Sequence, residues 1–205
     1  MTAMRRRSRY RAMACAAWLA VNTSALAQTE RNFDPIRTLP DGQITRIERI
    51  EDIPRQLARA VARHCRLDES QLRELPIAVF RPTENGRVLA LVPCGTIIWY
   101  HMAFVFQRTQ NEPDLLSFPV IDPDGGFTVS QAPGVMTWDA STQTLVARGG
   151  NDMCTASVGR HTYRYSRTQA GMFTLIRVER GQACRDDDAH WTVIWQAQPW
   201  PRDAR

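Results

Sequence analysis

The side chains best suited to redox or metal chemistry in this 205-residue chain are five cysteines and four histidines. No two cysteines have C-x-x-C spacing, and no two histidines have the H-x-x-x-H spacing of a zinc site, so we expect no metal and no cofactor. Four cysteines lie downstream of the N-terminal segment. An even number in an exported protein is typical of disulfides. These four are Cys65, Cys94, Cys154 and Cys184.

Candidate catalytic groups do not form a recognisable constellation. Ser157 and His161, with Asp152 nearby, could suggest a hydrolase, but residues four apart on a strand share a face without touching, and no G-x-S-x-G is present. The run at 186–188 is Asp-Asp-Asp without the alternating spacing of a calcium loop, which favours a solvated acidic turn. We therefore assign no catalytic residue. Paired carboxylates for glycoside cleavage follow no local motif and stay open.

Candidate ligand-binding residues centre on one expected strand, residues 161–167. Its aromatic side chains alternate and so share one face, a pattern typical of a half-exposed strand, and we interpret the aromatic face with its neighbouring arginines as a binding surface. Exposed aromatic and Arg clusters are common at interfaces. Two tryptophans at 191 and 195 could form a sugar-stacking platform, although packing in the core is favoured. The candidate ligand-binding residues are Tyr163, Tyr165, Arg164, His161 and Asp152.

The N-terminal segment has the pattern of a Sec-type signal peptide. An Arg-rich stretch at 5–11 precedes an apolar stretch at 12–21 and the small-residue site Ala25-Leu26-Ala27. We expect residues 1–27 to be removed and the mature protein, which would start at Gln28, to be periplasmic or secreted. The apolar stretch is shorter than the roughly 20 residues that span a bilayer, so we expect no stable membrane insertion.

Removal of this segment also changes the charge of the protein. Five of the 26 basic residues lie in it, which leaves 21 basic and 21 acidic residues in the mature chain. The overall charge of +5 is therefore no argument for nucleic-acid binding. We expect no nucleic acid among the partners.

One helix is predicted near the start of the mature chain, after a lead-in at 28–51 that is partly ordered at best. Asp52 would be its N-cap and Pro54 would lie in its first turn, with apolar residues following at helical spacing up to Cys65. The opposite face carries three arginines at 55, 59 and 63. They could bind an anion, but a solvated face is favoured.

From Pro76 onward the sequence predicts short β-strands separated by turn residues such as Asn85-Gly86. No helical crossovers lie between them, which excludes a parallel βαβ sheet. The residues at 97–107 are apolar on both faces and predict a central strand. We expect an α+β, mainly β fold: an antiparallel meander that forms a sheet, sandwich or partly closed barrel, with the N-terminal helix packed on it. Residues 52–200 would form this single disulfide-stapled domain.

Four cysteines allow three pairings, which the sequence alone distinguishes weakly. The strands at 161–167 and 172–179 should form a hairpin, and Cys154 and Cys184 flank it almost evenly. We therefore predict a Cys154–Cys184 bond, which leaves Cys65 to pair with Cys94 and to tie the helix end to the strand before the central one.

Several segments together resemble a known family. Leu89–Cys94 is followed by Trp99-Tyr100, Arg148–Cys154 carries two glycines, and Cys184-Arg185 precedes Trp191–Trp195. In order and spacing, over about residues 65–196, these resemble the L-x-x-V-x-C, R-G-x-G-D-C-G, C-R-G and W-P-x-L-W motifs of the proteobacterial periplasmic domain-of-unknown-function family 1176. The family's G-A-Y-N is replaced here by Trp-Tyr-His, and Asp186 stands where its C-R-G has glycine.

Membership would imply a periplasmic location and two disulfides, and it supplies no catalytic residue. We expect an exported, non-catalytic binding or interaction module of the bacterial envelope, whose partner is an envelope protein, a glycan or a small ligand. The alternative is a periplasmic hydrolase of cell-wall or carbohydrate material, with Asp152, His161 and the acidic residues at 186–188 as its polar cluster.

Overall fold

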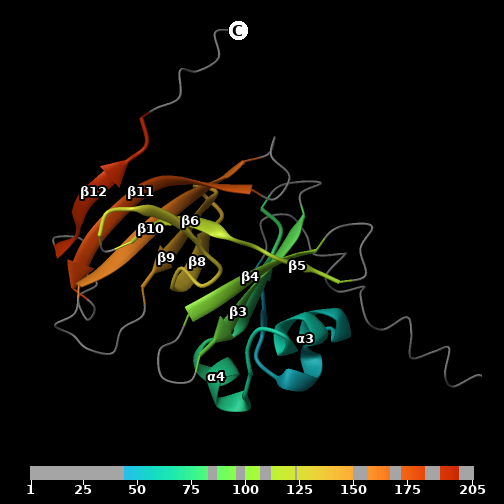
Figure 1. The fold of residues 1–205 in the computed structure, drawn as a ribbon. Coiled ribbons are helices and arrows are strands. Elements are labelled where there is room, and N and C mark those ends of the chain that lie inside the picture. The colour runs from blue at the N-terminus through green and yellow to red at the C-terminus, as the bar shows by residue number, and fades with distance from the viewer. Residues whose placement is uncertain are drawn as a thin grey trace, which may run out of the picture. The chain divides into compact units, whose positions relative to one another are not determined.

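Antiparallel strands dominate the computed structural model (Figure 1). It describes residues 44–82, 87–95, 100–106, 112–122, 124–149, 157–166, 172–182 and 190–198. All of these belong to the unit Pro35–Arg205. The expected signal peptide at 1–27, as well as Asp152, Cys154, Cys184 and the acidic run at 186–188, lies outside the described residues.

The first five-stranded sheet has its strands in sequence order, and we call it sheet A. The hairpin expected around Asn85-Gly86 joins its second and third strands, while the turn itself lies outside the described residues. The predicted central strand is the fourth, and residues 101–106 are buried on both faces as expected. Its strands are β1 (Ile44–Ile47), β2 (Ile77–Phe80), β3 (Val88–Cys94), β4 (Tyr100–Phe106) and β5 (Asp114–Leu115).

The second five-stranded sheet, sheet C, is also antiparallel, and a separate two-stranded hairpin lies between the two sheets in sequence. The predicted hairpin of residues 161–167 and 172–179 is confirmed as the longest pairing in sheet C. The sheets are not closed into a barrel. The hairpin strands are β6 (Phe118–Ile121) and β7 (Phe127–Ser130), and sheet C consists of β8 (Val135–Asp139), β9 (Thr144–Arg148), β10 (Ser157–Ser166), β11 (Met172–Gln182) and β12 (Thr192–Gln196).

One hydrophobic core joins the two sheets and the hairpin. Phe80 of β2 stacks on Trp138 of β8, with ring centroids 4.9 Å apart, and Phe118 of β6 contacts the rings of Tyr163 and Phe173. Aromatic side chains bury large areas and so dominate the energy of such a core. Strands make up most of the described secondary structure, with a few short helices, so the predicted α+β, mainly β class is correct.

The predicted helix begins later than expected. Helix α3 (Arg55–Ala62) has Pro54 as its N-cap residue, while Asp52 belongs to the preceding 3-10 turn η2 (Ile50–Asp52), and Cys65 follows the helix end. The extended backbone of Pro54 separates the two turns, so Asp52 cannot cap α3. Leu57 and Val61 are buried as the spacing predicted.

The lead-in, which we expected to be partly ordered at best, contributes a strand to the domain. Residues Ile44–Ile47 pair antiparallel with β2, with Ile44 opposite Phe80, so the sheet begins before residue 52. The pattern Ile-Thr-Arg-Ile is too short to identify a strand from its sequence, and the backbone of β2 supplies the hydrogen bonds that order it. Among the described residues, no helix is long and apolar enough to cross a membrane.

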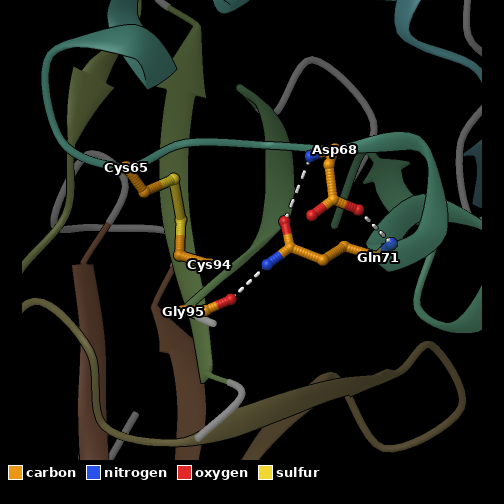
Figure 2. Close-up of a disulfide and its surroundings, with 5 residues drawn as sticks. All are labelled: Cys65, Asp68, Gln71, Cys94 and Gly95. Carbon is orange, nitrogen blue, oxygen red and sulfur yellow. Dashed lines mark hydrogen bonds between the residues drawn. A yellow bond between two sulfur atoms is a disulfide. The ribbon is translucent and has the colours of Figure 1, made fainter. Parts of the chain in front are cut away.

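The predicted Cys65–Cys94 disulfide is present and links the chain after α3 to the last residue of β3 (Figure 2). A second link lies beside it. Asp68 and Gln71 form a capping box at the start of helix α4 (Glu69–Glu74), and the Gln71 side-chain amide donates to the carbonyl of Gly95. The other predicted disulfide, Cys154–Cys184, lies outside the described residues and stays a prediction.

Candidate functional site

The strand at 161–166 is half-exposed as predicted, but its aromatic face, which we expected to bind a ligand, is the face that lies in the core. Tyr163 is fully buried, and Tyr165 and His161 are also buried, whereas Arg164 is exposed on the opposite face of β10. The alternation was read correctly, but the β6–β7 hairpin and the aromatic residues of β2 and β8 cover the aromatic side. Asp152 lies outside the described residues.

Two of these residues bind the chain's own backbone. The hydroxyl of Tyr163 donates to the carbonyl of Pro119 at 3.0 Å, and the backbone N–H of Ile121 donates to Nε2 of His161 at 3.2 Å. Both backbone groups lie on the edge of β6 that faces away from β7. Side chains of β10 therefore satisfy buried polar groups that a neighbouring strand would otherwise satisfy.

A second buried histidine has the same role between sheets A and C. His101 of β4 accepts the backbone N–H of Met136 of β8 at its Nδ1, at 2.7 Å. Its own backbone N–H donates to the carbonyl of Gly134 at 2.8 Å. Gly134 has φ +136°, and a Cβ there would lie 2.0 Å from the carbonyl oxygen of Arg148, so only glycine fits this crossing.

Burial controls the ionisation of these three side chains. Burial lowers the pKa of His101 to about 4 and also lowers the pKa of His161 below its usual value. Burial raises the pKa of the Tyr163 hydroxyl. Each histidine is neutral at pH 7, and one ring nitrogen already accepts a backbone hydrogen bond. Both are positioning residues for the fold, and neither offers an open base to a substrate.

We expect stability to fall as the pH drops below the ordinary histidine range. His101 has a folded pKa of about 4 against 6.5 for the free group, so the unfolded chain binds the proton first. The contribution of His101 to the free energy of unfolding is fully present above about pH 6.5 and falls by about 3 kcal/mol toward pH 4. Urea unfolding at a series of pH values measures the decline. His101→Gln, which cannot take up a proton, should make the decline shallower and leave the part due to His161, and an unchanged slope in this variant would contradict the assignment.

The outer face of sheet C carries an internally paired charge cluster that the sequence did not reveal. Glu179 is almost completely buried between Arg160, at 2.7 Å, and Arg177, at 2.6 Å. The Arg160 guanidinium also lies over the ring of Trp191, 4.5 Å from its centroid. Trp191 is buried, which agrees with the favoured packing interpretation. Because each charge has a partner, we interpret the cluster as structural.

The most distinctive exposed surface is apolar. Phe127 and Val129 of β7 are 63% and 67% exposed, and the Phe127 ring meets Trp195 of β12 edge-on at 5.6 Å. We call Phe127, Val129 and Trp195 the β7 patch. The pairing of β7 with β6 explains its orientation: Thr128 and Ser130 lie opposite the buried Val120 and Phe118, so Phe127 and Val129 point to the other side.

The fold and this surface define an antiparallel, mainly β protein with an exposed apolar strand. No family model, curated protein or solved structure matches the chain. The resemblance to the proteobacterial periplasmic family therefore stays a prediction, and the function has to be argued from the site itself.

Proposed function

We propose that this protein is an exported, non-catalytic interaction module of the cell envelope and that its β7 patch binds an apolar surface on another envelope protein. The observation that carries the proposal is the exposure of Phe127 and Val129. Both are more exposed than any other large apolar side chain in the described residues. Clustered exposed apolar residues mark interaction sites, whereas isolated ones are ordinary.

The distribution of such residues supports a real cluster. Of the six exposed large apolar side chains in the described residues, four lie on β7 and β12, and the Phe127–Trp195 contact joins the two strands. The remaining two are Ile44 and Ile50. The β7 patch thus joins side chains from two strands that are distant in sequence, β7 and β12.

The chemistry of the patch favours a protein over a glycan or a small polar ligand. Val129 has no hydrogen-bonding side-chain atoms, and the Phe127 ring is held edge-on to Trp195. Sugars need polar groups beside an aromatic face, whereas apolar protein surfaces need only matching shape. The hydrolase alternative gains no support, because His161 is buried and bonded to Ile121.

Export rests on the signal-peptide pattern, and the Cys65–Cys94 bond is consistent with it because disulfides persist in oxidising compartments.

Site-specific photo-crosslinking tests the proposed surface. A benzoylphenylalanine at position 129 should give a discrete heavier adduct in intact cells, because Val129 is the most exposed residue of the patch. The matched control places the same residue at Ile50, which is 41% exposed but far from the patch in sequence. We expect no adduct from position 50. Identical adducts from both positions, or none from position 129, would contradict the proposal.

A further inference from the structure

The outer strands of the two five-stranded sheets differ in how they are protected. Edge strands expose unpaired backbone groups, and proteins usually guard them with charges, proline, β-bulges or short length. Strand β1 carries Arg46, β8 carries Asp139, and β5 is only two residues long and includes Asp114. The fourth edge, β12, has the sequence Thr-Val-Ile-Trp-Gln with neither charge nor proline. Among the described edges of these two sheets it is the one with neither a charged residue nor a proline, although its pairing with β11 has a register shift.

The exposed side chains of β12 are also apolar. Val193 and Ile194 are each 43% exposed. The pairing with β11 shifts register between Val178 and Glu179, which leaves Ile194 without a partner residue on β11. An uncharged strand of β-branched and aromatic residues has a high preference for pairing with another strand.

We propose that β12 pairs antiparallel with β12 of a second copy of this chain about a two-fold axis near Ile194, which joins two copies of sheet C into one continuous sheet. A two-fold interface places the same strand on both sides, so it must be complementary to itself. Strand β12 meets this condition because it has no charge to repel its twin, and apolar residues would lie opposite apolar residues. This inference goes beyond the proposed function: it concerns the free edge of β12, whereas the β7 patch takes only Trp195 from that strand.

The charge of the protein agrees with self-association. The expected mature chain has equal numbers of basic and acidic residues, so no net repulsion opposes the approach of two copies. A guarded edge such as β1, with Arg46 in its middle, would place like charges next to each other in the same arrangement.

Sedimentation of the oxidised mature protein tests the proposal. We expect a dimer mass at tens of micromolar and a monomer for Ile194→Lys, because the two buried charges should lower the affinity of the dimer more than tenfold. The matched control is Ile44→Lys on β1, which is 45% exposed and should remain dimeric. Circular dichroism confirms that both variants are folded. A monomer mass for the unmodified protein at every concentration, or dissociation by the Ile44 change only, would overturn the proposal.

A crosslink locates the interface and separates it from the β7 patch. Ile194→Cys should form an intermolecular disulfide seen on non-reducing gels, while Ile44→Cys should not. The double variant Phe127→Ser, Val129→Ser should lose the proposed envelope partner but keep the dimer mass. If that double variant instead becomes monomeric, the two copies meet through the β7 patch and the β12 pairing is wrong.

Discussion

Replacement of Phe80 by alanine should lower the free energy of unfolding by about 3 to 5 kcal/mol. Phe80 is fully buried at the end of β2, and its ring stacks on Trp138, so it joins sheet A to sheet C. The smaller side chain leaves a cavity that the two sheets cannot close without moving apart. Urea unfolding followed by tryptophan fluorescence measures the loss.

The matched control is Phe127→Ala, the same chemical change at a position that is 63% exposed. We expect this variant to change stability by less than about 0.5 kcal/mol, because little buried area is lost. Equal losses in the two variants would show that Phe127 lies in a core rather than on a surface. A loss below about 1 kcal/mol at Phe80 would show that the two sheets do not share the core described above.

Removal of the Cys65–Cys94 bond should cost about 3 to 4 kcal/mol, because the bond closes a loop with a sequence separation of 29 and so restricts the unfolded chain. The double variant Cys65→Ser, Cys94→Ala removes the bond without leaving an unpaired thiol. The Cys94 side chain is buried, so alanine is preferred there. Urea midpoints of the oxidised proteins give the difference.

Single replacements provide the control for this measurement. Cys65→Ser alone should cost nearly as much as the double change, since either substitution removes the same bond. If the single variant instead matches the unmodified protein in stability, Cys65 forms no stabilising disulfide and the Cys65–Cys94 pairing is wrong.

Much of the fold could be predicted from local pattern. Residues 101–106 are apolar on both sides, and the strand they form is buried on both faces. The hairpin of β10 and β11 and the Cys65–Cys94 bond followed from short separations along the chain. Two predictions failed where the local sequence pattern was weak. Asp52 resembles a helix cap, but the extended Pro54 separates it from the helix. Ile44–Ile47 is too short to indicate a strand without β2 beside it.

The sequence by itself determined that β10 and β7 each have two different faces, because side chains alternate along a strand. Only the tertiary structure decided which face is buried. On β10, His161 and Tyr163 look suited to a ligand, yet their partners are the backbone of Ile121 and Pro119, which come from a hairpin about forty residues away. On β7, the register with β6 turns Phe127 and Val129 to solvent. Burial depends on which elements meet in space, and alternation within one strand carries no information about its neighbours.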